Sequence, residues 1–392
     1  MSAVEQLLKA VDEAAQNGDE AVLATVVKVE GSAYRRPGAR MLINALGQTE
    51  GTVSGGCLET EVARTAWWLT ERGPALRSYS TAEDDEDGDA AVRFGLGCNG
   101  TVHLLFERIG SAACRLLLDG CRTLTPGNAG FSVATVVNAA QPELLGQRLL
   151  LSADEQLHGS LPVDWSAPLL PLLQQARFTQ RAALHRFRQP AGEVEVLIEH
   201  LRPARRLVIF GGGHDAQPLV RMAKLQGLHV TVVDSRAHFA RASRFPDADA
   251  VLLGQLDSGF ALADLLADAA VVVMTHSLQQ DAWWLAQALR SSACYIGQLG
   301  PRERTERLLG GMAQAGELKG LARLHYPVGL DLGGDTPESV ALAILGEITA
   351  VLNGRTGGLL QQRQTAIHEP SSIHIHDWCE QDLQTPSSVE SN

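Results

Sequence analysis

The chain has 392 residues, more than one domain usually holds, so two folded units and a tail are expected. Its formal net charge of −12 and the absence of clustered lysine and arginine exclude a nucleic-acid-binding protein. No apolar run reaches the roughly 20 residues that cross a bilayer, and the N-terminus predicts an acidic amphipathic helix, so we expect a cytoplasmic protein with no membrane partner. The six cysteines form no CxxC pair and indicate reduced thiols.

Residues 1–200 predict a mixed α/β domain, with two subdomains as the alternative. A helix over residues 4–15 precedes a Val-rich strand over residues 21–30, which leads into a loop marked by glycine and proline. Strands and helices then alternate to residue 200 without a sharp linker. The loop carries four side chains that suit an anionic ligand: Tyr34, Arg35, Arg36 and Arg40.

A turn of small residues in this region holds a candidate reactive thiol. Ser54, Gly55, Gly56 and Cys57 precede a helix, and such a turn points backbone N–H groups at whatever lies above it. The helix dipole would stabilise the thiolate of Cys57, which makes this residue a candidate soft metal ligand or sulfur carrier. A buried structural thiol is the alternative.

A second glycine-rich segment contains Cys98. Because Cys57 and Cys98 both follow strand-like segments and both lie among glycines, we expect them to be close together. The acidic run of residues 83–89 between them is expected to be a solvated loop, since like charges repel and cannot share a core.

Residues 205–354 predict a Rossmann-like, doubly wound parallel sheet. The buried strands RLVIF, HVTVVD and AVVVMTH alternate with amphipathic helices, and this alternation requires crossover connections. The last helix has Thr336 as its N-cap, Pro337 at its first position and Gly354 past its end. The expected fold class is therefore α/β, with a Rossmann-like domain after a mixed N-terminal domain.

The first strand of this sheet runs into the motif GGGHDA, which fits the phosphate turn G-x-G-x-x-A. Gly211 permits the tight turn, Gly213 lets a pyrophosphate approach, and His214 either contacts the ligand or lies beneath the loop. Asp234 closes the second strand, where its carboxylate can accept hydrogen bonds from ribose hydroxyls. Asp215, beside the same helix N-terminus, would repel a phosphate. A Rossmann scaffold that binds no nucleotide is the alternative.

Other loops are expected at the same edge of this sheet. Thr275 and His276 end a predicted parallel strand, at the edge where open α/β sheets bind ligands. Asp281 begins the next helix, and its role is open between site residue and helix cap. The segments around Gly297 and Gly329 end in the same layer, so several loops converge on one crevice.

Residues 355–392 are polar and rich in serine and glutamine, and we expect them to be disordered. Within them, His374, His376 and Cys379 resemble a metal-binding tract, which we interpret as incidental because no second ligand pair accompanies it. The chain has no GxSxG, HExxH or P-loop lysine motif, so hydrolases and phosphotransferases of those kinds have no support.

Seven motifs follow one another along the chain: GSAYRRPGARMLI, GTVSGGCLETEV, GLGCNGTVHLL, VIFGGGHDAQPL, MTHSLQQD, YIGQLGPRERTERL and VGLDLGGDTPESVALAIL. In this order they resemble the XdhC/CoxI family, accessory proteins of molybdenum hydroxylases such as xanthine dehydrogenase and carbon monoxide dehydrogenase. The resemblance covers most of residues 21–353 and is weakest between residues 111 and 200.

The resemblance implies a cofactor-binding chaperone rather than a catalyst. Such a protein holds molybdenum cofactor, as molybdopterin or its nucleotide form, and assists its sulfuration with a cysteine desulfurase. It then delivers the cofactor to the apo-hydroxylase, and it is expected to self-associate. The expected cofactor-binding residues, of which Cys57 is also the candidate metal ligand, are Gly55, Gly56, Cys57, Cys98, Gly211, Gly213, His214, Asp234 and His276.

Two other functions stay open from the sequence. The first is an NAD(P)-dependent oxidoreductase that uses the Rossmann domain, although no proton-relay pair is visible for it. The second is a protein-interaction adaptor whose Rossmann domain no longer binds a ligand.

Overall fold

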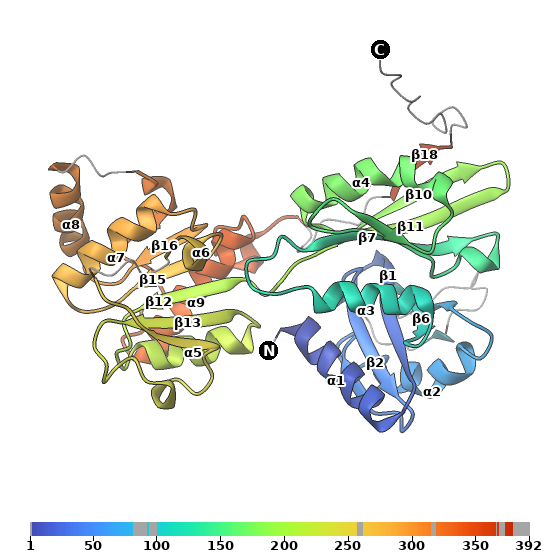
Figure 1. Cartoon of the computed structure of the whole chain (residues 1–392), viewed down its shortest axis with the longest axis horizontal. Coiled ribbons are helices and arrows are strands. Elements are labelled where there is room, and N and C mark those ends of the chain that lie inside the picture. The colour runs from blue at the N-terminus through green and yellow to red at the C-terminus, as the bar shows by residue number, and fades with distance from the viewer. Residues whose placement is uncertain are drawn as a thin grey trace, which may run out of the picture. The chain divides into compact units, whose positions relative to one another are not determined.

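The computed structural model describes residues 2–80, 92–93, 100–256, 262–314, 319–365, 367 and 373–378. The chain forms two compact units (Figure 1). The N-terminal unit consists of Ala3–Leu124, Asn128–Arg202 and His368–Asn392. The Rossmann unit consists of Met1–Ser2, Thr125–Gly127 and Pro203–Ile367.

Among the described residues, the N-terminal unit holds two six-stranded sheets. Sheet A has the order β3-β2-β1-β6-β4-β5, and sheet B has the order β18-β10-β11-β7-β8-β9. The strands of sheet A are β1 (Ala21–Gly31), β2 (Arg40–Asn44), β3 (Thr49–Gly51), β4 (Ala75–Ser80), β5 (Val92–Arg93) and β6 (Gly100–Arg108). Those of sheet B are β7 (Phe131–Ala139), β8 (Arg148–Leu151), β9 (Leu157–Gly159), β10 (Ala183–Gln189), β11 (Gly192–Leu201) and β18 (Ile373–Asp377).

Helices cover both sheets of the N-terminal unit (Figure 1). They are α1 (Ala3–Asn17), α2 (Glu59–Leu69), α3 (Ala112–Arg122) and α4 (Ser166–Thr179). On β1, Leu23 packs with α1 and α3, whereas its neighbours Val22 and Ala24 pack with α2. Because β1 is covered on both faces, its first seven residues, Ala21 to Val27, are all buried.

Two ion pairs join sheet A to sheet B. Arg148 of β8 donates from Nη1 and Nη2 to both oxygens of Glu107 of β6, at 2.7 and 2.5 Å, and neither side chain is more than 1% exposed. Burial alone would lower the pKa of Arg148, but Glu107 raises it above its usual range. Arg40 of β2 pairs with Glu199 of β11. The prediction that Arg40 serves an anionic ligand is therefore wrong, because the carboxylate of Glu199 neutralises the charge of Arg40.

Contrary to the expected disorder, the described part of the tail contains a strand, β18, which pairs in parallel with β10. Nδ1 of His185 and Nε2 of His376 lie 2.9 Å apart, and the rings of His374 and His376 both stack on that of His185. Trp378 packs on Trp165 with 4.7 Å between ring centroids. The composition of the tail did not predict this strand, because the strand is stabilised by pairing with β10, almost two hundred residues earlier in the chain. Cys379 lies outside the described residues.

The Rossmann unit holds a parallel sheet of the order β14-β13-β12-β15-β16-β17. Its strands are β12 (Arg206–Phe210), β13 (His229–Asp234), β14 (Ala250–Leu253), β15 (Ala270–Val273), β16 (Tyr295–Gln298) and β17 (Leu324–His325). Its helices are α5 (Ala216–Leu225), α6 (Leu262–Leu266), α7 (Leu278–Arg290), α8 (Arg302–Gln314) and α9 (Pro337–Leu352). Helices α5 and α9 cover one face, and α6, α7 and α8 cover the other (Figure 1).

This arrangement confirms the predicted α/β class with a Rossmann-like parallel sheet. Thr336 caps α9, accepting a hydrogen bond from the N–H of Ser339 at 3.1 Å, and Pro337 is the first helical residue, as predicted. The strand order reverses between β12 and β15, so the ligand-binding crevice of such a sheet is expected above these two strands. Within the described ranges, no helix combines the length and hydrophobicity that crossing a bilayer requires.

Candidate functional site

The turn after β12, residues 211–215, is called here the Gly211 turn. Gly211 has φ +118°, and its N–H donates to the carbonyl of Val233 at 2.8 Å. A Cβ at this position would lie 2.5 Å from the carbonyl oxygen of Met274, closer than real Cβ atoms come. Glycine is thus required here both by the backbone conformation and by the approach of the chain after β15.

Two amides of the Gly211 turn donate to no acceptor among the described residues. In the part of the chain that the structure describes, no acceptor bonds to the N–H groups of Gly213 and His214, which precede the first turn of α5. A Cβ at Gly213 would meet only the ring of His276, at an ordinary 3.6 Å. Protein packing therefore does not require this glycine, and the phosphate role of Gly213 stays a prediction.

Asp234, the candidate ribose ligand, is saturated with internal hydrogen bonds. Its Oδ1 accepts from N and Nε of Arg236, both at 2.9 Å, and its Oδ2 accepts from the N–H of Gly212 at 2.7 Å and from Nη2 of Arg236 at 2.8 Å. Burial alone would raise the pKa of Asp234, but these bonds hold it below its usual value. The guanidinium of Arg236 also lies 4.0 Å above the ring of Phe239. Asp234 thus holds the Gly211 turn in place through its hydrogen bond with the N–H of Gly212.

His276 stands beside the Gly211 turn at the end of β15. It has φ +62°, a conformation that non-glycine residues adopt rarely, and its side chain is 59% exposed. Its Nε2 lies 3.5 Å from Oδ2 of Asp215, the N-cap residue of α5. His214 is exposed as well. Two imidazoles and one carboxylate therefore border the two open amides.

Asp281 ties three elements together beneath this crevice. It is 1% exposed, and its Oδ1 accepts from N and Oγ1 of Thr275 at 3.1 and 2.6 Å. Its Oδ2 accepts from Nε2 of Gln298 at 3.2 Å and from Nη2 of Arg304 at 2.6 Å. The N-cap of α7 is Ser277 instead. Asp281 of α7 is therefore a buried junction with the chain after β15, with β16 and with α8, a network that the sequence did not reveal.

A pocket of about 240 Å³ opens at this junction. Its volume is below the range of about 300–1,000 Å³ that complete small-molecule sites occupy, so it suits one end of a ligand. Because it adjoins His276, it lies at the reversal of strand order where doubly wound sheets bind ligands. The residues lining it are Met274, His276, Asp281, Leu299, Gly300, Pro301 and Arg304.

The turn before α2 in the N-terminal unit, residues 52–58, is called here the Glu59 turn. Five of its backbone N–H groups already donate hydrogen bonds to the carboxylate of Glu59, so these five are not available to a ligand. Burial alone would raise the pKa of Glu59, but these bonds, with those from the hydroxyls of Ser54 and Thr52, lower it to about 2. The five donors are Val53, Ser54, Gly55, Gly56 and Leu58, at 2.9–3.2 Å.

Cys57 is exposed, so the alternative of a buried structural thiol is wrong. The backbone N–H of Cys57 donates to Oγ of Ser54 at 3.1 Å, which fixes the residue on the turn. The ring of Tyr34, which is 75% exposed, lies beside Gly55 and would be 3.6 Å from a Cβ there. The Glu59 turn thus presents a thiol and a neighbouring aromatic ring to solvent, and it presents no open amide cradle.

Not every candidate can be placed. Cys98 and the acidic residues 83–89 lie outside the described residues. Among the residues that are described, no three histidine, cysteine, aspartate or glutamate side chains are arranged to hold a metal ion.

Comparison with known proteins follows the same division of the chain. Residues 14–80 match the XdhC and CoxI family, and residues 207–348 match the XdhC Rossmann domain. A crystal structure described as a xanthine dehydrogenase from Bacillus halodurans has a TM-score of 0.72 and 28% identity, covering 91% of this chain and 97% of that one. This similarity agrees with the fold described above.

Two curated relatives align over nearly their full lengths. A protein of Bacillus subtilis (strain 168) described as a probable xanthine dehydrogenase subunit is 32% identical over 339 residues, which cover 86% of this chain and 95% of the relative. The molybdenum cofactor insertion chaperone PaoD of Escherichia coli (strain K12) is 24% identical over 371 residues, 93% of this chain and 92% of the relative. The chain belongs to the XdhC and CoxI family, as its motifs predicted.

Proposed function

We propose that this protein is an accessory factor that binds molybdenum cofactor, assists its sulfuration and delivers it to a molybdenum hydroxylase. The observation that carries the proposal is an exposed thiol on a rigid turn, Cys57, in a chain that aligns over nine-tenths of its length with a molybdenum cofactor insertion chaperone. A hydroxylase apo-enzyme and a cysteine desulfurase are the partners that this role requires.

Each of the two units, taken by itself, offers a contact that such a cofactor can use. When bound, the cofactor supplies a molybdenum centre with soft sulfur ligands and an anionic pterin phosphate. A thiolate at Cys57 is a soft ligand of the kind that such a centre accepts, and the fixed backbone around it keeps its position constant. In the Rossmann unit, the open amides of Gly213 and His214 at a helix N-terminus suit a phosphate.

The alternative of an NAD(P)-dependent oxidoreductase fits the residues less well. A ribose hydroxyl pair would have to displace Arg236 from Asp234, whose oxygens already accept four hydrogen bonds. Asp215 adds a second carboxylate beside the site of the pyrophosphate. The occupied Asp234 disfavours a dinucleotide in particular, whereas Asp215 acts equally on any phosphate that binds there.

The test compares two exposed cysteines. Full-length protein, Cys57→Ser and the control Cys294→Ser would be purified from a host that makes molybdenum cofactor. Molybdenum would be measured by mass spectrometry and the pterin by fluorescence after oxidation. We expect the wild type and Cys294→Ser to retain cofactor and Cys57→Ser to retain about tenfold less, as loss of a soft metal ligand predicts. Cofactor-free wild-type protein, or equal retention by all three, would refute the proposal.

A further inference from the structure

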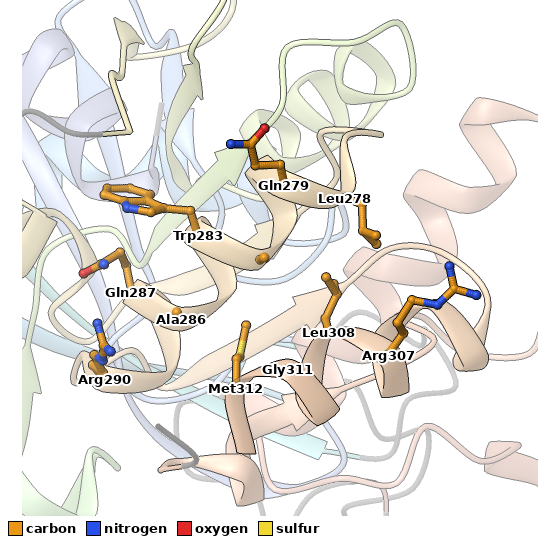
Figure 2. A pocket seen from close by; sticks show the side chains of 11 residues that line it. Leu278, Gln279, Trp283, Ala286, Gln287, Arg290, Arg307, Leu308, Gly311 and Met312 are labelled. Atoms are coloured by element: carbon orange, nitrogen blue, oxygen red, sulfur yellow. The ribbon is translucent and has the colours of Figure 1, made fainter. Parts of the chain in front are cut away.

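The pocket of about 240 Å³ that adjoins His276 is called here the Arg304 pocket. A larger groove of about 710 Å³ lies between α7 and α8 (Figure 2), and the two cavities share no lining residue. The Arg304 pocket combines apolar walls with the ion pair of Asp281 and Arg304, and apolar walls with a few fixed polar groups are usual in small-molecule sites. The apolar side chains of the lining are Met274, Leu299 and Pro301.

The ion pair contributes no net charge to the Arg304 pocket. Nη2 of Arg304 donates to Oδ2 of Asp281 at 2.6 Å, and the carboxylate is buried. Because the two charges cancel, an anion that entered the pocket would lose its hydration without a net attraction in return. The pocket therefore favours a neutral end of a ligand over a charged end.

The hydrogen-bond donors of Arg304 are nevertheless not exhausted. Among the described residues, only Nη2 of this guanidinium has an acceptor, so the N–H groups of Nε and Nη1 have none. The side chain is 28% exposed and lies against Gly300, where a Cβ would be 3.1 Å from Cδ of Arg304. The oxygens of Asp281 already accept four hydrogen bonds from the protein. The ion pair thus offers donors without a free acceptor, which suits a neutral group that accepts hydrogen bonds, such as a ring carbonyl.

His276 connects the Arg304 pocket to the open amides of the Gly211 turn. Its side chain lines the pocket, and its Nε2 would lie 3.6 Å from a Cβ on Gly213. A ligand that fills the pocket and extends past His276 therefore reaches the N–H groups of Gly213 and His214. Those amides lie at a helix N-terminus and suit a phosphate. The two adjoining subsites together suit a neutral ring that is joined to a phosphate.

We propose that the Arg304 pocket binds a neutral planar heterocycle through its ring carbonyl, with the phosphate of the same ligand on the amides of Gly213 and His214. The free N–H groups of Arg304 donate to the carbonyl oxygen, while Asp281 holds the guanidinium in place. The identity of this ligand rests on the proposed function: the carbonyl is that of the pterin ring, and Arg304 is the residue that determines specificity for it.

The test uses the full-length protein and two fluorescent probes, pterin and diaminopteridine, in which a second amino group replaces the ring carbonyl of pterin. We expect pterin to bind about tenfold more tightly in fluorescence titration, because the amino group leaves the donors of Arg304 unpaired. Benzoate, a ring that carries a carboxylate, should compete about tenfold more weakly than pterin, because the ion pair offers an anion no net charge. Equal binding of the two pteridines, or stronger competition by benzoate, would overturn the proposal.

A conservative variant tests the role of Arg304. Arg304→Lys keeps a positive charge for Asp281 but removes the planar set of N–H donors. The preference for pterin over diaminopteridine should fall below about threefold in this variant. An unchanged preference would show that Arg304 does not determine specificity.

Two exposed positions provide a matched pair of steric variants. Pro301→Trp fills the Arg304 pocket and should weaken pterin binding about tenfold, whereas Gly310→Trp, on α8 but outside the lining, should change it less than about twofold. A Cβ at Gly310 meets no atom within 4 Å, so the control adds a side chain without disturbing the fold. Equal effects of the two tryptophans would overturn the assignment of pterin to this pocket.

These outcomes are distinct from those that test the proposed function. Wild-type protein that copurifies with cofactor but does not prefer pterin would overturn the assignment of the pocket alone. Wild-type protein that carries no cofactor but prefers pterin, and loses this preference in Arg304→Lys, would refute the accessory role and support the pocket.

Discussion

The two small-residue turns of this protein resemble each other in sequence and differ in what their amides bind. In the Glu59 turn, one internal carboxylate accepts hydrogen bonds from five backbone N–H groups. In the Gly211 turn, Val233 and Asp234 accept from the first two, and the next two have no acceptor among the described residues. Glycine content therefore predicts which amides are accessible, but a nearby acidic residue decides whether they are available to a ligand.

The largest effect is expected inside the Gly211 turn itself. Gly211→Ala places a methyl group 2.5 Å from a backbone oxygen at φ +118°, so β12 and the chain after β15 must separate. We expect a loss of about 3 kcal/mol or more in the free energy of unfolding, measured by urea titration. Gly213→Ala should cost less than about 1 kcal/mol, because its methyl group meets only the His276 ring at 3.6 Å. Equal losses would show that both glycines are structural.

Removing the internal anion tests the Glu59 turn. Glu59→Gln replaces a carboxylate that accepts at least seven hydrogen bonds with an amide that has one acceptor oxygen. We expect a loss of about 2 kcal/mol in urea unfolding, less than the pKa shift implies because the turn is partly exposed. The control is Glu61→Gln, two residues along α2, which pairs with the exposed Arg64 and should change stability by less than about 0.5 kcal/mol.

The pH dependence of the stability difference between wild type and Glu59→Gln tests whether the ionised carboxylate stabilises the Glu59 turn. The pKa of Glu59 falls from 4.5 to about 2 on folding, so its contribution is complete above pH 4.5 and is lost as the pH falls from 4.5 towards 2. Wild type and Glu59→Gln should therefore differ in stability at pH 6 and converge near pH 2. A constant difference across this range would mean that the ionised carboxylate is not what stabilises the turn.

Sequence patterns predicted the fold better than they predicted the site. The Rossmann sheet, the cap at Thr336 and the position of the Gly211 turn follow from local periodicity and helix-end chemistry, which neighbouring residues determine. The pairing of Arg40 with Glu199 could not be predicted, because it joins strands 159 residues apart. The role of Glu59 had a signal that was missed: an acidic residue in the first helical turn after a glycine-rich loop can bond back to that loop.

The smallest effect concerns Asp215, whose carboxylate lies beside the open amides. Asp215 lies at the N-terminus of α5 and approaches the exposed His276 at 3.5 Å, a weak contact, so Asp215→Asn should change stability by less than about 0.5 kcal/mol. The same change removes a negative charge from the place where a phosphate would bind, and we expect inorganic pyrophosphate to bind about threefold more tightly in calorimetry. Asp264→Asn, which removes an exposed carboxylate from α6, is the charge-matched control and should leave binding unchanged. If Asp215→Asn gains nothing over this control, the amides of Gly213 and His214 do not form an anion site, and the contrast between the two turns lies only in their internal acceptors.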